Sequence, residues 1–288
     1  MPDIWGLSSI LTKWLLYTGL TGATGITMVR IVFWSHVKPL ETRLRRFSLV
    51  LAGIALTAAV LSFLLRGAAL TGDISGMVDR EMLGLLWTTP VGEAFTYRLA
   101  GVVLVIVGLY IPAIGAWVSL AGGIVALWSF TQIGHIPDLE QTGVRLLLLL
   151  HLLGVSFWVG ILAPLHWLAR DPEYLEIAAY LGDHFGVMAS GIVAVLVLAG
   201  GLMAWLILGS VSLLFTSSYG LALVVKVTLV ALLLGLAAAN KLRFIPGMKA
   251  GKQQAANHLV RSIELEFIVI TSVLIATATL TSVVSLPM

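Results

Sequence analysis

The stretch VRLLLLLHLLGVSFWVGILAPLHWL, residues 144–168, decides the fold class of this chain. A single helix needs about 20 mostly apolar residues to cross the hydrocarbon core of a bilayer. The stretch exceeds that length, and the only formal charge that interrupts it is Arg145. It therefore predicts a membrane-spanning helix.

Comparable apolar runs recur along the rest of the chain. Hydrophobic residues make up 59% of the 288 residues and charged residues only 11%, whereas a soluble domain carries about 25% charged residues. A lipid bilayer solvates such an apolar surface, provided that each segment satisfies its own backbone groups as a helix does. We therefore predict an all-α polytopic membrane protein of about eight transmembrane helices, at 8–34, 46–66, 95–111, 113–131, 144–168, 184–209, 220–242 and 259–284.

Basic residues indicate how these helices are oriented. Short loops rich in Lys and Arg stay on the cytoplasmic side, and the loops at 35–46 and after the seventh span are of that kind. The loop at 67–94 holds one basic residue and the loop at 210–219 holds none. We expect a bacterial inner-membrane protein with both termini in the periplasm. The cytoplasmic residues concerned are Lys38, Arg43, Arg45, Arg46, Lys241, Arg243, Lys249 and Lys252.

The composition and the missing motifs exclude several functions. The net charge of +3 comes from basic residues beside apolar runs, so we expect no nucleic-acid partner. There are no cysteines, which excludes disulfides and thiolate metal sites. The N-terminus lacks the early positive charge of a cleavable signal. No P-loop, Gly-x-Ser-x-Gly or His-Glu-x-x-His motif occurs, which favours a transporter over an enzyme.

A weak internal repeat divides the predicted spans into two sets of four. Thr88-Thr89-x-x-Gly92 precedes Arg98 by the same spacing that separates Thr216-Ser217-x-x-Gly220 from Lys226, and Gly19 and Gly25 correspond to Gly154 and Gly160. We therefore expect an N-terminal half at 1–131 and a C-terminal half at 132–288, as parallel repeats. Chance similarity among glycine-rich apolar helices is the other interpretation.

Histidines are the main candidates for metal ligands in a chain without cysteine. His151 lies in the outer third of the fifth span, where a polar ring is costly unless it faces a partner inside the bundle. His135 lies in the preceding outward loop. His166 and His184 lie near the cytoplasmic ends of adjacent spans, as do His36 and His258 beside basic loops. A structural hydrogen bond is the alternative role for His151.

Three charged residues fall inside predicted spans. Arg98 and Lys226 each lie about two turns into a helix, and Glu266 lies about as deep in the eighth span from the other side. Charges at such depth face the interior or water, although the two basic side chains can also extend outward to the interface. We regard Arg98, Lys226 and Glu266 as candidates for a charge or proton relay. For Glu266, an ion pair with Arg261 or Lys241 is the structural alternative.

The residues from 134 onward resemble the CopD copper-resistance family of bacterial inner-membrane proteins. The resemblance rests on Gly134-His135, on His151-x6-Trp158-x-Gly160-x-Leu162-x-Pro164 and on Thr216-x-x-Tyr219-Gly220-x5-Lys226, followed by Asn240-Lys241, Pro246, Arg261-Ser262 and Glu266. It implies copper transport from periplasm to cytoplasm, a periplasmic CopC-like carrier as partner, and His135 and His151 as copper-related positions. Many relatives carry a His in the first span where this chain has Leu16.

Two other functions are compatible with the same residues. Some four-helix relatives of this type are associated with haem, so a haem b protein ligated by His151, or by His166 and His184, is one alternative. A scaffold for another membrane complex is the other.

Overall fold

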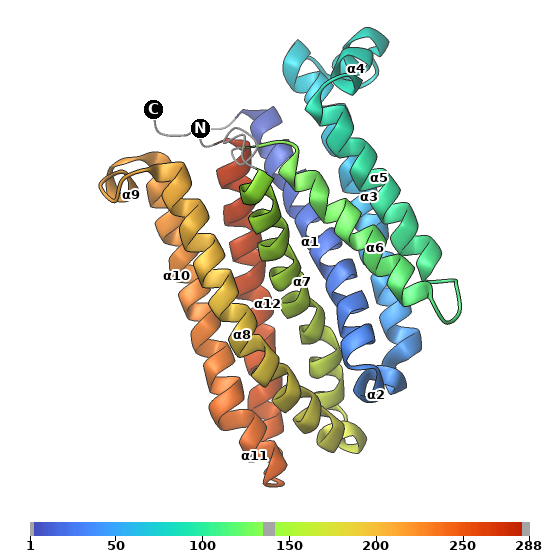
Figure 1. The fold of residues 1–288 in the computed structure, drawn as a ribbon, viewed down its shortest axis with the longest axis vertical. Coiled ribbons are helices and arrows are strands. Elements are labelled where there is room, and N and C mark those ends of the chain that lie inside the picture. Colours follow the sequence, from blue (N-terminus) through green and yellow to red (C-terminus); the bar gives the residue numbers. More distant parts are fainter. Residues whose placement is uncertain (1–2, 135–141, 284–288) are drawn as a thin grey trace.

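A computed structural model describes residues 3–134 and 142–283 of the chain. Within these ranges the structure is helical and contains no strand. Seven helices are long and apolar enough to cross a membrane, and an eighth apolar segment at Gly115–Thr131 is shorter. The predicted all-α polytopic membrane fold is therefore confirmed (Figure 1).

The long helices differ from the predicted spans mainly at their ends. α3 continues past its apolar core into polar sequence on both sides, and α8 begins within the acidic segment that the sequence assigns to a loop. Helices continue into the interfacial region because their backbone bonds do not depend on lipid. The long helices are α1 (Ile4–Val32), α3 (Glu41–Thr71), α5 (Pro90–Gly108), α6 (Gly115–Trp128), α7 (Thr142–Arg170), α8 (Leu175–Leu208), α10 (Ser218–Ala239) and α12 (Gln253–Ser282).

Short helices connect these segments at the two ends of the bundle. The start of α1 and the end of α12 share one end with α4 and α9, which we call the terminal face; α2 and α11 lie at the other end, the opposite face (Figure 1). A short connection that contains Pro112 joins α5 to α6. The short elements are α2 (Trp34–Val37), η1 (Lys38–Leu40), η2 (Ile74–Met77), α4 (Arg80–Trp87), η3 (Ser129–Thr131), η5 (Pro172–Tyr174), α9 (Leu213–Thr216), the π-helical turn η6 (Asn240–Phe244) and α11 (Ile245–Lys249).

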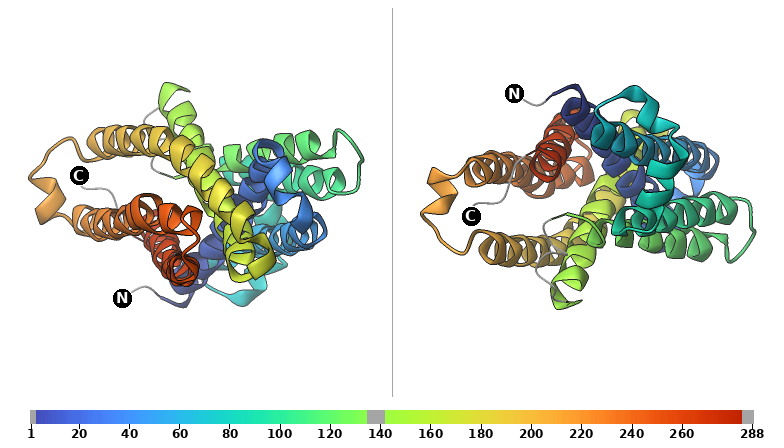
Figure 2. Two further views of the ribbon diagram at one scale, coloured as in Figure 1. Left: turned by 90° about the horizontal axis from the view of Figure 1, so that it is seen from below. Right: turned by 90° about the horizontal axis from the view of Figure 1, so that it is seen from above.

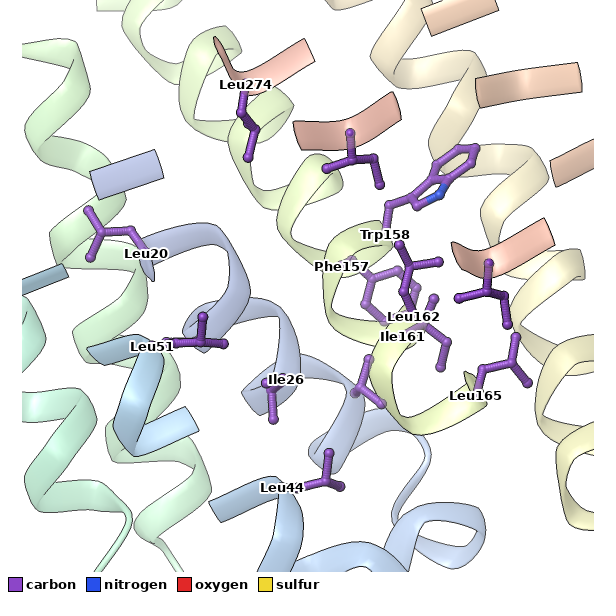
Figure 3. Packing of buried hydrophobic residues seen from close by; sticks show 14 of the residues in the cluster. Leu20, Ile26, Leu44, Leu51, Phe157, Trp158, Ile161, Leu162, Leu165 and Leu274 are labelled. Atoms are coloured by element: carbon purple, nitrogen blue, oxygen red, sulfur yellow. The ribbon is translucent and has the colours of Figure 1, made fainter. Parts of the chain in front are cut away.

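Helix α1 forms the centre of the core. It packs against α3, α6, α7 and α12, and Leu20 and Ile26 belong to one hydrophobic cluster with Phe157 and Ile161 of α7 (Figure 3). The two helices approach most closely at Gly25 and Gly160, where an added Cβ on Gly25 would lie 1.9 Å from the carbonyl oxygen of Ser156. Small residues permit this close crossing.

The long helices form two bundles that meet at α1 and α7. We call α1, α3, α5 and α6 the first bundle, and α7, α8, α10 and α12 the second bundle. In the first bundle α3 packs along α5 and α5 along α6. In the second bundle α10 packs along α12, while α8 and α10 diverge toward the terminal face, where α9 bridges them (Figure 2). The second bundle is therefore the more open one.

Candidate functional site: a polar track along helix α7

Three polar side chains follow one side of α7 through the second bundle. His151, Trp158 and His166 are separated by seven and eight residues, or about 10 and 12 Å along a helix axis. Residues at such spacing share a helix face. Figure 3 shows Trp158 on the side of α7 that points away from α1. We call His151, Trp158, His166 and the acidic partners described below the polar track.

His151 lies at the end of the track nearest the terminal face. Its Nδ1 is buried and has no hydrogen-bond partner in the described structure, and the backbone of Leu196 on α8 lies close to the ring. The ring faces α8 at Gly200, because a Cβ added there would lie 3.6 Å from the ring Cε1. The ring is therefore directed into the second bundle, and its buried nitrogen is available to a ligand.

The charged residue near His151 is a cation. Lys226 on α10 lies within electrostatic range of the ring, and the ion pairs of the described residues do not include it. Its positive charge raises the energy of a second cation at His151.

Glu266 occupies the middle of the track. It is 2% exposed and accepts a hydrogen bond from Trp158 Nε1 at 3.2 Å and another from Asn240 Nδ2. The suggested ion pairs with Arg261 and Lys241 are wrong: the ion pairs between described residues do not include Glu266, and the Lys241 ammonium donates to Ser190. The track therefore contains a buried acid that has no cationic partner among the described residues.

The track ends near the opposite face at His166. Its Nε2 lies 3.2 Å from an oxygen of Glu264, which is half exposed. His184, predicted as a partner of His166, instead has its ring 5.3 Å from the ring of His36. Adjacent spans bring both histidines to the same end of the bundle, but each contacts a different residue.

Arg98 belongs to the first bundle and is fully inside it. It is 5% exposed, its Nε donates to Ser129 Oγ at 3.1 Å, and its guanidinium lies over the ring of Phe130. It does not extend outward to the interface. Lys13 of α1, within electrostatic range of Arg98, donates to the backbone oxygen of Thr281. The two basic residues are thus hydrogen-bonded to the fold, which favours a structural role.

One member of the predicted metal set, His135, lies outside the described residues. Groups of three or more His, Asp or Glu side chains able to hold a metal do not occur among the residues described. Among the described residues, these side chain types therefore come together in groups of two at most. Such sites suit a soft, low-coordinate ion better than Zn²⁺, which takes four ligands.

Sequence reasoning missed the partners of three residues of this region. Asn240, His36 and Lys13 carry contacts that depend on the tertiary structure. In the sequence Asn240 is visible only as part of a motif, without a role. His36 stands in a basic loop without a partner, and the position of Lys13 inside α1 is the one available signal.

An apolar cavity of about 380 Å³ separates α8 from α10 near the terminal face. Trp205, Phe215 and Leu223 contribute to its walls. Such walls offer no ligand to a metal ion. The cavity is therefore not part of the polar track.

Comparison with known families gives two matches. The model described as "Copper resistance protein D-like, N-terminal domain" matches residues 1–140. The model described as "Copper resistance protein D" matches residues 180–280, which include Lys226, Asn240 and Glu266. No curated protein and no solved structure matches the chain.

Proposed function

This chain belongs to the copper resistance protein D family, and we propose that it carries copper across the bacterial inner membrane from periplasm to cytoplasm. The family and the spanning helices make it a copper-resistance membrane protein. The polar track along α7 supports the finer proposal. A cation crossing the hydrocarbon core needs compensating charge and ligands inside the bundle, and the track supplies both.

The buried carboxylate of Glu266 is the observation that carries this proposal. Among the described residues it is an acid in the core without an ion-pair partner. Only neutral donors hold it, namely Trp158 and Asn240. Its negative charge would compensate a monovalent copper ion halfway through the membrane. The same carboxylate is suited to a proton relay, which the sequence also suggests.

The orientation of the track fits inward movement. The basic loops and α11 lie at the opposite face, which we assign to the cytoplasm by the distribution of Lys and Arg. Copper would then meet His135 and His151 first, pass Glu266 and leave past His166 and Glu264. Lys226 beside His151 keeps the first binding step weak, and a transfer site must release its ion as readily as it binds it.

The partners and driving force follow from the same arrangement. A periplasmic CopC-like carrier is the proposed source of copper at the terminal face, and the lipid bilayer surrounds the bundle. The chain has no nucleotide-binding motif. A monovalent cation moving inward gains roughly 2.3 kcal/mol through 100 mV of membrane potential, which is a sufficient driving force for uptake.

Glu266→Gln tests the proposal. The amide keeps the size of the side chain and an oxygen that can accept from Trp158 or Asn240, but it removes the charge. We expect copper accumulation by cells that express the variant to fall at least about tenfold, since tenfold corresponds to about 1.4 kcal/mol. Accumulation is measured as cellular copper above that of cells without the protein, at matched amounts of protein in the membrane.

Glu93→Gln is the matched control. Glu93 is an exposed acid in the first turn of α5, in the first bundle and outside the polar track. Its removal leaves the track intact, so we expect accumulation within a factor of a few of wild type. Unchanged accumulation in Glu266→Gln would refute transport through the polar track.

The haem alternative rests on the free Nδ1 of His151. A haem b ligated there, or by His166 or His184, gives a Soret absorbance in the purified protein. The scaffold alternative predicts neither bound haem nor any loss of copper accumulation in Glu266→Gln.

A further inference from the structure

Two histidines far apart in the sequence meet at the opposite face. His36 lies on α2, immediately after the first long helix, and His184 lies in the third turn of α8. Their ring centroids are 5.3 Å apart and the ring planes are inclined by 76°. One ring comes from the first bundle and the other from the second. The contact therefore exists only because the two bundles pack together.

A neighbouring hydroxyl orients the ring of His36. Ser35 Oγ lies 3.1 Å from His36 Nδ1. If Nδ1–H donates to this oxygen, the lone pair of the neutral ring lies on Nε2. In metal-binding histidines, a hydrogen bond from the ring nitrogen that does not bind the metal fixes the tautomer in this way. In that tautomer Nε2 of His36 is free to bind a ligand.

His184 is also available as a ligand. It is exposed, and the side-chain hydrogen bonds and ion pairs found among the described residues do not include it. The adjacent carboxylate of Asp183 forms an ion pair with Lys249 at 2.5 Å. Asp183 is thus already neutralised, and the pair of imidazoles has no acidic neighbour that would attract a hard cation.

Aromatic packing holds the backbone of both histidines in place. Phe33, three residues before His36, stacks on Phe157 of α7 at 5.9 Å, and Phe157 packs on Phe185, the residue after His184, at 5.6 Å. These buried or half-buried rings link α1, α7 and α8. Sites on rigid elements hold their ligands more accurately than sites on loops.

We propose that His36 and His184 together bind one Cu(I) ion in a two-coordinate site at the opposite face. Two neutral imidazoles at this separation can turn their nitrogens toward one small ion. Cu(I) is stable with two such ligands, whereas Zn²⁺ seeks four. The site deepens the proposed transport function, on which its role as the place of copper release depends, but its affinity for Cu(I) can be measured without transport.

The test is a Cu(I) titration of the purified full chain in detergent, in competition with a chromophoric Cu(I) chelator under reducing conditions. The variants are His36→Ala, His184→Ala and the double variant, with His258→Ala as the matched control. His258 also lies near the opposite face, but its ring packs on Phe244 at 5.6 Å. A folded, monodisperse elution profile is required of each.

We expect each single variant to bind one Cu(I) ion at least about tenfold more weakly than the wild type, because loss of a group from a metal site lowers metal affinity by about that factor. The double variant should lose no more Cu(I) affinity than the single variants, because both residues bind the same ion. X-ray absorption of the copper-loaded protein should show two imidazole nitrogens and lose that signature in either variant. Wild-type affinity in both single variants, or equal loss in His258→Ala, would overturn the proposal.

Glu266→Gln separates this proposal from the proposed transport function. If Glu266→Gln abolishes copper accumulation but still binds the Cu(I) ion assigned to His36 and His184, both proposals stand. Cells with Glu266→Gln could instead accumulate copper normally while His36→Ala and His184→Ala lose the bound Cu(I) ion. That result would refute transport through the polar track and leave the two-histidine site standing.

Discussion

The first and second bundles have the same succession of helices but different packing. In the first, α3 lies against α5, and Arg98 is enclosed with Ser129 and Phe130 as partners. In the second, α8 and α10 diverge around an apolar cavity, and neither His151 Nδ1 nor Asn240 Oδ1 has a hydrogen-bond partner in the described structure. The first bundle gives its buried cation hydrogen-bonding and aromatic partners, whereas the second leaves a ring nitrogen and an amide oxygen without them; buried hydroxyls without partners, such as those of Thr24 and Ser48, occur in the first bundle as well. This difference supports the second as the route for an ion.

The predicted division into repeats at 1–131 and 132–288 stays a prediction, and several contacts support it. Gly25 of α1 touches its proposed counterpart Gly160 of α7, as expected where an axis between two repeats passes. Thr89 and Ser217, also counterparts, both cap the helix that follows them through a side-chain oxygen. Arg98 and Lys226 then occupy corresponding helices with different surroundings.

The largest expected effect comes from the contact between the bundles. Gly25→Ala places a methyl group against the backbone of Ser156 and Gly160, and overpacking of this kind costs about 1–3 kcal/mol or more. We expect a sharp fall in folded protein, measured as the monodisperse fraction and the thermal midpoint in detergent. Gly53→Ala, with no atom within 4 Å of the added Cβ, should leave both unchanged. Equal behaviour of the two variants would show that this crossing does not hold the bundles together.

The second effect concerns the free nitrogen of the second bundle. His151→Ala removes the candidate ligand nearest the terminal face, and we expect copper accumulation to fall about tenfold. The thermal midpoint should change little, because Nδ1 has no hydrogen bond to lose. His258→Ala is the control for removal of a histidine. Normal accumulation in His151→Ala would assign this residue a packing role and weaken the contrast between the bundles.

A further pair of variants compares the two corresponding cations. Arg98→Met removes a charged hydrogen bond to Ser129 and should lower the free energy of unfolding by about 1.5–3 kcal/mol. Lys226→Met removes a basic side chain that forms no ion pair with the described residues. It should change the free energy of unfolding by less than about 1 kcal/mol. It should also increase copper retention, since repulsion at His151 is lost. Reversed effects would contradict the assigned roles.

Much of the fold could be predicted from apolar run lengths, because lipid imposes the same length and the same helical backbone on every span. The segment predicted at 113–131 is found at Gly115–Thr131. The early start of α8 escapes this reasoning, because that part of the helix lies in polar sequence. The inward placement of Arg98, His151 and Glu266 follows from the cost of polar groups in lipid.

The partners of these residues do not follow, because they come from distant helices. The sequence suggests Arg261 or Lys241 beside Glu266, which instead accepts from Trp158 and Asn240. It suggests His166 beside His184, which instead lies beside His36.

The sequence by itself determined that this chain lies in a membrane and which polar residues must face its interior, since both depend on transfer of single segments into lipid. Only the tertiary structure decided which of these residues meet. The physical reason is that the partners come from helices far apart in the sequence, whose positions relative to one another are fixed by packing such as the close crossing of α1 and α7 at Gly25 and Gly160.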